Sequence, residues 1–221
     1  MKKRKAFRTK ITRLYPIFTL TITGFMLTAC VLGQENVQEQ VQTHISKMEA
    51  SIENPVNPDT STTSNPYDDI QNNEHFEAIL ELGIPALPEL KQSLAHSDQD
   101  GLVEYIYAIA LEKISKTEMS EQTEWRTGKE FYTIYSAYLK EIPDKVTSIA
   151  AEPVSDKEKI AQLKALGVPA IPYIFDVINH GKQELSPALH YLTDNESKSD
   201  MRKWSVEHID QLNLLTDFVE E

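Results

Sequence analysis

The chain has 221 residues, a length that suits one domain with a buried core. It carries 34 acidic and 22 basic residues, a formal net charge of −12. A surface of this sign repels phosphate backbones and excludes nucleic acid as its partner. Cys30 is the only cysteine, so no disulfide can form within the chain.

The N-terminal segment is strongly basic and then apolar. Residues 1–13 hold seven basic residues and no acidic one, and an apolar run follows from Leu14 to Ala29. This run is shorter than the roughly 20 residues that a membrane-spanning helix needs. A basic region, a short apolar region and small residues at the end are typical of a secretory signal peptide.

The apolar run ends in Leu27-Thr28-Ala29-Cys30. This tetrapeptide resembles the lipobox of bacterial lipoproteins, in which the cysteine is acylated and becomes the new N-terminus after cleavage. The resemblance implies that residues 1–29 are a lipoprotein signal peptide and that Cys30 carries diacylglycerol and a fatty acyl chain such as palmitate. It also implies a place on the outer face of the bacterial cytoplasmic membrane. The alternatives are an uncleaved membrane anchor and an ordinary signal peptide that happens to end in cysteine.

Residues 30–66 are predicted to form a polar tether, since they contain no aromatic residue and residues 54–66 are rich in Pro, Ser, Thr and Asn. Cleavage after Ala29 would leave 15 basic and 34 acidic residues, a net charge of −19, which fits a domain held away from anionic lipid. A seam of apolar residues recurs every three or four positions in the first half of the tether: Val37, Val41, Ile45, Met48 and Ile52. This spacing predicts a short amphipathic helix, either transient or docked on the main domain, with self-association through the seam as the other alternative.

Residues 67–221 are predicted to form one all-α domain, because runs of β-branched residues with period two are absent. Residues 82–88 read Leu-Gly-Ile-Pro-Ala-Leu-Pro and return as Leu-Gly-Val-Pro-Ala-Ile-Pro at 166–172. Glycine can close a helix and proline suits the first turn of the next one. The pattern therefore predicts a helix, a tight corner and a second helix, within two imperfect repeats at about 74–115 and 155–193.

Other helices are predicted around and between these corners. Residues 102–114 are apolar around almost the whole helix circumference, which predicts the buried core of the domain. A helix is expected over about 124–140, followed by an irregular crossing to Pro153 with a short helix near 146–150. Ser155 and Glu158 form a capping-box pattern at the start of the second repeat. Apolar residues spaced from Trp204 to Phe218 predict one closing helix.

Helix pairs joined by a repeated Leu-Gly-x-Pro-Ala corner resemble HEAT-type repeats. The resemblance implies a fragment of an α-solenoid, with stacked helix pairs and a concave side that often binds a protein or peptide. That family has no shared catalytic residues. The domain is also similar to small helical lipoproteins of Gram-positive bacteria.

The six histidines do not predict a metal site, because no two stand at helical i, i+4 spacing and no HExxH motif occurs. His96 and His180 occupy the same place in the two repeats and are expected to cap helix ends. The segment from His96 to Gly101 has two acidic residues at calcium-loop intervals, but Tyr107 stands where the bidentate Glu belongs. Asp100 is instead expected to cap a helix.

No catalytic cluster is predicted, since no serine sits in a G-x-S-x-G elbow and carboxylates are too numerous for any pair to stand out. Glu104 and Glu184 recur at equivalent points of the repeats, where a first helical turn favours an acid anyway. Among the aromatic residues, most fall on inward stripes, and Trp125 and Tyr132 are the candidates for partner binding.

The sequence therefore favours a non-catalytic, membrane-anchored extracytoplasmic lipoprotein, without metal or cofactor, that binds an envelope protein or peptide. The alternative is a cell-wall-directed enzyme or a glycan- or ligand-binding lipoprotein. An open concave face would favour the first, and a closed pocket with converging carboxylates or histidines the second.

Overall fold

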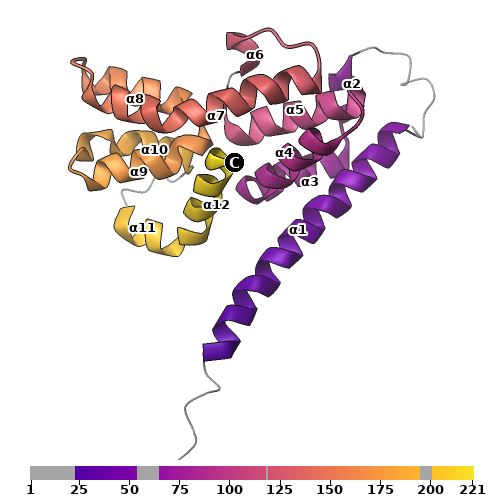
Figure 1. The fold of residues 1–221 in the computed structure, drawn as a ribbon, viewed down its shortest axis with the longest axis horizontal. Helices are drawn as coiled ribbons and strands as arrows, with labels where there is room; N and C mark the ends of the chain where they lie inside the picture. Colours follow the sequence, from indigo (N-terminus) through magenta and orange to yellow (C-terminus); the bar gives the residue numbers. More distant parts are fainter. Residues whose placement is uncertain (1–22, 54–64, 118, 195–200) are drawn as a thin grey trace, which may run out of the picture. The chain divides into compact units, whose positions relative to one another are not determined.

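The computed structural model describes residues 23–53, 65–117, 119–194 and 201–221, and these residues form helices joined by turns (Figure 1). The predicted all-α fold is confirmed. The chain divides into two units, Met1–Asn36 and Val37–Glu221. Most of the predicted signal peptide, residues 1–22, lies outside the described residues. The second unit holds the repeats and the candidate site.

Each repeat consists of three α-helices with a 3₁₀ turn after the first. The elements of the first repeat are α3 (Glu74–Leu82), η1 (Ile84–Ala86), α4 (Leu87–His96) and α5 (Leu102–Ser115). Those of the second are α8 (Asp156–Ala165), η2 (Val168–Ala170), α9 (Ile171–Asn179), η3 (Gln183–Leu185) and α10 (Ser186–Leu192). The remaining elements are α1 (Thr23–Glu53), α2 (Pro66–Ile70), α6 (Met119–Gln122), α7 (Gly128–Ala151), α11 (Met201–Glu207) and α12 (Ile209–Glu220).

The two Gly-x-Pro corners have matching geometry. Gly83 and Gly167 have φ angles of 64° and 76°, in the half of conformational space that favours glycine. The amide of Gly83 donates to a carbonyl three residues back at 3.1 Å, and that of Gly167 does the same at 3.1 Å. Each glycine carbonyl accepts from the alanine three residues on, Ala86 at 2.9 Å and Ala170 at 3.1 Å. The predicted helix, corner and helix are therefore present in both repeats.

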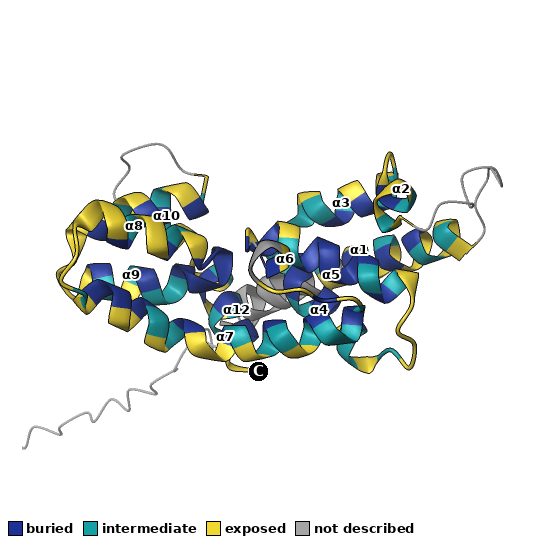
Figure 2. Cartoon of the chain, turned by 90° about the horizontal axis from the view of Figure 1, so that it is seen from above, coloured by how far each residue is buried: buried dark blue, intermediate teal, exposed yellow. Residues whose placement is uncertain are grey.

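The helix α5 lies in the core, as its apolar circumference predicts. It packs on α3, α4 and α7, and its residues 106–111 are all buried (Figure 2). The helix α7 lies between the repeats and packs on α4 and α5 of the first and on α8 and α9 of the second (Figure 1). The C-terminal helix α12 packs on α7 and α9. One continuous core thus joins both repeats.

The prediction of a helix that ends near residue 140, followed by an irregular crossing, is wrong. The helix α7 runs unbroken from Gly128 to Ala151 with Pro143 inside it. An internal proline costs about 3 kcal/mol, because it removes a backbone hydrogen bond and crowds the preceding turn. Leu139, Ile142 and Val146 are buried around it, and each buried apolar side chain contributes about 1.5–3 kcal/mol. The burial of these side chains therefore outweighs the cost of Pro143, and the helix continues through it.

The segment Val37–Glu53 also differs from the predicted domain boundary at residue 67. It belongs to the second unit, where Val41, Ile45 and Met48 are buried and Val37 and Ile52 are half-buried. Polar contacts flank this stripe: Gln42 donates to Glu89 at 2.5 Å, Asn73 to Ser51 at 3.0 Å, and Tyr107 to Glu49. The docked form of the predicted amphipathic helix is the one observed, and the main domain starts earlier than residue 67.

Lysines satisfy the carbonyl groups at several helix C-termini. Lys129 of α7 donates to the carbonyls of Leu94 and Ser97, at 2.8 and 2.6 Å, at the end of α4. Lys159 donates to Ala150 at the end of α7, and Lys91 to Phe218 near the end of α12, both at 3.1 Å. The last turn of a helix leaves carbonyls unpaired and favours positive charge. These lysines thus join each helix end to a neighbouring helix.

The predicted single closing helix is two helices, α11 and α12, which meet at His208. Val206 and Ile209 near the break are 75% and 50% exposed, so the apolar spacing there does not mark one inward face. Across the residues that the structure describes, no single helix has both the length and the apolar character of a membrane span. Helix α8 with the segment Val168–Asn179 meets that test only as a pair bent by 116°.

Candidate functional site

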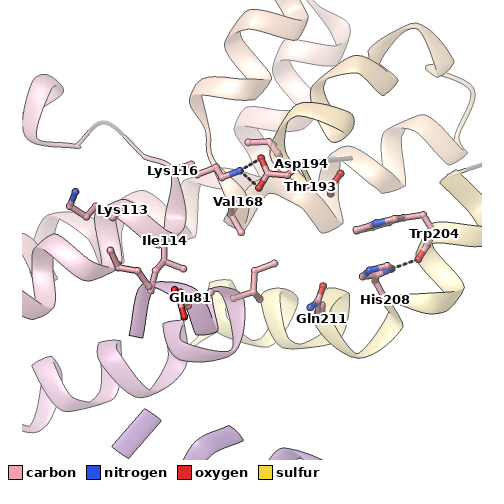
Figure 3. A pocket seen from close by; sticks show the side chains of 14 residues that line it. Glu81, Lys113, Ile114, Lys116, Val168, Thr193, Asp194, Trp204, His208 and Gln211 are labelled. Carbon is pink, nitrogen blue, oxygen red and sulfur yellow. Dashed lines mark hydrogen bonds and ion pairs between the residues drawn. The ribbon is translucent and has the colours of Figure 1, made fainter. Parts of the chain in front are cut away.

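A hollow lies where the two repeats and the C-terminal helices meet. We call it the inter-repeat pocket; its volume is about 490 Å³, within the range of small-ligand and peptide side-chain sites. Its walls come from the α3–η1 corner, the end of α5, the η2 corner, the end of α10 and the α11–α12 junction (Figure 3). Both repeated corners therefore contribute to one pocket.

The pocket has an apolar floor and a polar rim. Ile114, Val168 and Leu192 are buried and lie at its base. Glu81 and Lys113 are exposed and belong to the rim. A ligand with both apolar side chains and hydrogen-bonding groups suits this lining, because each kind of group finds a matching surface.

An ion pair crosses the rim between the repeats. The Lys116 ammonium lies 2.7 and 2.8 Å from the two carboxylate oxygens of Asp194. The backbone of both residues has positive φ, 52° and 51°, just after the third helix of each repeat. A left-handed residue just past the last turn is a common way for a helix to end, so these angles mark the ends of α5 and α10. The pair joins the ends of the two repeats at the pocket.

Two stacked rings form another wall. Trp204 and His208 have ring centroids 4.5 Å apart and an interplanar angle of 11°. His208 Nδ1 lies 2.8 Å from the Trp204 carbonyl oxygen (Figure 3). Since a carbonyl only accepts, this nitrogen carries a proton and donates to it. Gln211 adds an amide one turn away. The wall therefore offers a flat aromatic surface beside hydrogen-bonding groups.

One of the charged groups in the pocket is already paired. The acid nearest to a cation in the pocket, Asp194, is already held by Lys116. Over the described parts of the chain, no three His, Cys, Asp or Glu side chains gather into a metal-binding group. A nucleophile with an adjacent base, the arrangement that covalent catalysis requires, is not among the pocket's lining residues.

The two predicted partner-binding aromatics lie elsewhere. Trp125 is buried, with 8% exposed, and packs on Tyr105 and Phe131 at centroid distances of 4.5 and 5.1 Å. Its ring is therefore part of the core and not a contact surface. Tyr132 is half-buried and lines a separate hollow of about 360 Å³ with Lys91.

Lys91 in that second hollow is buried and donates to a backbone carbonyl. Burial lowers the pKa of Lys91, while the charge of Glu221 raises it and that of Lys140 lowers it further. The ammonium also lies 5.1 Å from the Phe218 ring centroid. These contacts place Lys91 in the packing of α4 against α12. Partner binding by Tyr132 stays a prediction.

The predicted caps are placed as follows. His96 and His180 Nδ1 lie 3.0 and 2.9 Å from carbonyls one turn earlier in their helices, so the equivalent capping role is confirmed. The Ser155 capping box is also confirmed, with the Glu158 amide 3.3 Å from the serine hydroxyl. Asp100 caps α7 rather than the helix that follows it, accepting from the Lys129 amide at 3.1 Å.

Glu104 and Glu184 differ although they are equivalent in the repeats. Glu184 is exposed, whereas the buried Glu104 carboxylate accepts from Ser97 Oγ at 2.5 Å and from the Gly101 amide at 2.8 Å. Burial raises the pKa of Glu104, but these hydrogen bonds outweigh it and hold the pKa below its ordinary value. Glu104 therefore closes the loop between α4 and α5.

Sequence reasoning missed the residues that line the inter-repeat pocket. Trp204 reads as a core residue of the last helix, and Lys116, Asp194, His208 and Gln211 carry no motif. The only sequence signal for this place is that the repeated corners stand at equivalent positions. Side chains of Leu27, Thr28, Ala29 and Cys30 are not described, so the predicted lipidation site stays a prediction.

The fold and the pocket define a class: an all-α protein of two corner-containing helical repeats with a ligand-sized pocket between them. Compared with known proteins, the chain matches no family model, no curated protein and no solved structure.

Proposed function

We propose that this chain is a non-catalytic lipoprotein on the outer face of the bacterial cytoplasmic membrane whose inter-repeat pocket binds a peptide segment of an envelope protein. The anchor rests on the basic and apolar N-terminus and on the Leu27–Cys30 lipobox, with acyl chains on Cys30 as the link to the membrane. The repeats are taken as a HEAT-like pair, whose stacked helices leave a binding surface where they meet.

The observation that carries the binding proposal is the pocket between the two corners. Its apolar base, at Ile114 and Val168, accommodates one or two apolar side chains of a peptide. Polar rim groups such as Gln211 and Thr193 can pair with peptide N–H and C=O groups. Such pairing is needed because an extended peptide brings unpaired backbone groups to the contact.

The binding test uses a photo-reactive residue placed at Gln211 in living cells, with the exposed Val154 as the matched control position. A peptide from the captured protein is then titrated against the full chain. Trp204→Ala is expected to weaken the binding of this peptide by about 2 kcal/mol or more, because buried aromatic anchors dominate the binding energy of such contacts. Equal capture at both positions, or unchanged affinity in Trp204→Ala, would refute the proposal.

The anchor is tested separately by labelling cells with a palmitate analogue. Wild-type protein is expected to take up label and to fractionate with membranes, and Cys30→Ala to take up none. Label in Cys30→Ala, or an unlabelled wild-type chain, would refute the lipid anchor.

A second candidate ligand is a cell-wall glycan, and the stacked Trp204 and His208 rings favour it. Sugar rings present apolar faces to aromatic rings and hydroxyl groups to amides and carboxylates, which Gln211, Asp194 and Glu81 supply. Binding of purified glycan strands that is lost in Trp204→Ala would support this ligand in place of a peptide.

A further inference from the structure

A pair of histidines lies outside the inter-repeat pocket, where the docked helix α1 meets α3. His44 of α1 and His75 of α3 have ring centroids 5.6 Å apart, with their Nδ1 atoms 3.4 Å apart. The chain separates these residues by 31 positions, so the sequence gives no sign of the pair. Both side chains are half-buried.

The contact is a poor hydrogen bond. At 3.4 Å it is longer than the usual 2.7–3.2 Å of a nitrogen donor to its acceptor. Other histidines use Nδ1 differently, each placing it 2.8–3.0 Å from a carbonyl one turn back: His96, His180 and His208. In this pair, each Nδ1 faces the Nδ1 of the other ring instead.

The second nitrogen of His75 lies beside an acidic residue. His75 Nε2 lies 3.7 Å from a carboxylate oxygen of Glu74. The Glu74 side chain is 87% exposed, so this carboxylate adds negative charge beside the ring without a hydrogen bond to it.

We propose that His44 and His75 together bind a divalent transition-metal ion through their Nδ1 atoms, with water in the other positions. For an ion such as Zn²⁺ at about 2.0–2.1 Å from both atoms, their separation gives an N–Zn–N angle of roughly 110°, the tetrahedral value. Imidazole suits Zn²⁺, Cu²⁺ and Ni²⁺ and is a poor ligand for Mg²⁺ and Ca²⁺. Two protein ligands make an open site, and within the described parts of the chain no third His, Cys, Asp or Glu side chain joins them.

The surroundings hold the two ligands in place before any ion arrives. Ile45 and Met48, which stand close to His44 in the sequence of α1, are buried. Asn73, at the start of α3, donates to Ser51 of α1 at 3.0 Å. Little side-chain and helix ordering remains to be done on binding, which favours affinity. Within the main domain, a bound ion would join α3 to Val37–Glu53, the part of the domain that follows the proposed lipid anchor.

The test is a calorimetric titration of Zn²⁺, with Mg²⁺ as a comparison, into the full chain in detergent. One zinc ion per chain is expected for wild type, and loss of this binding in His44→Ala and in His75→Ala. The double variant His96→Ala/His180→Ala controls for histidines in general and is expected to bind as wild type does. Amide hydrogen exchange within residues 37–53 is expected to slow when Zn²⁺ is added to wild type.

A variant that loosens the same helix without removing a ligand separates metal binding from folding. Gln42→Ala removes the hydrogen bond to Glu89 and is expected to keep the zinc ion. Circular dichroism establishes that each variant stays helical. Failure of wild type to bind zinc more tightly than Mg²⁺, zinc binding by either single histidine variant, or equal loss in Gln42→Ala would overturn the proposal.

Discussion

The two corner glycines provide a paired test of the repeat junction, because they share a backbone conformation and differ in their surroundings. Gly83 and Gly167 have φ angles of 64° and 76°, with ψ of −134° and −174°. A side chain in this region costs about 1–3 kcal/mol at either site. A Cβ on Gly83 would meet nothing within 4 Å. A Cβ on Gly167 would overlap the Ser115 carbonyl oxygen and lie 2.8 Å from Thr117 Cγ2.

In Gly83→Ala the free energy of unfolding is therefore expected to fall only by the cost of the backbone conformation. In Gly167→Ala it is expected to fall by about 1–3 kcal/mol more, because the added side chain overpacks the site. In a domain of this size each kcal/mol lowers the midpoint of thermal unfolding by about 2–4 °C. An additional loss of about 2 kcal/mol in Gly167→Ala would lower its midpoint by about 4–8 °C below that of Gly83→Ala.

The assay is urea and thermal unfolding of the two purified variants and wild type, followed by far-ultraviolet circular dichroism. Equal destabilisation of both variants would refute the reasoning, since it would mean that the end of α5 does not approach the η2 corner as closely as the structure shows. A larger loss in Gly83→Ala would refute it as well.

Glu104 is expected to make the domain less stable in acid. The pKa of Glu104 in the folded state lies below the unfolded value of about 4.3, so its contribution to stability is present above that value and is lost as pH falls through the folded pKa. Glu104→Gln should flatten this part of a stability profile measured from pH 7 to pH 3. An unchanged slope would contradict the stabilising role of the Glu104 carboxylate. Lys129→Met is expected to cost about 1–3 kcal/mol in denaturant unfolding, because the carbonyls at the end of α4 lose a charged donor. Lys157→Met, at an exposed position, serves as the matched control, and a similar loss there would argue against the cap.

Local sequence patterns predicted the helices, the two corners and several caps, because each depends on residues a few positions apart. The glycine of a corner and the proline after it act within one turn, as do Ser155 and Glu158. His96 and His180 likewise reach a carbonyl in the preceding turn. These features are encoded within short segments and are the same whatever the rest of the chain does.

The errors arose where burial by distant residues decides the outcome. Pro143 breaks a helix by local rules, yet α7 continues because both repeats pack against it. Trp125 is as suitable for a contact surface as for a core, and its packing on Tyr105 and Phe131 assigns it to the core.

By itself, the sequence determined that this protein is helical and contains a duplicated corner, since the period of apolar residues and the glycine and proline positions are local properties. Only the tertiary structure decided where the pocket lies and which residues line it. Lys116 meets Asp194 across 78 positions, and His44 meets His75 across 31. Contacts at such separations depend on how helices pack, because many residues contribute to that packing at once and no short motif records it.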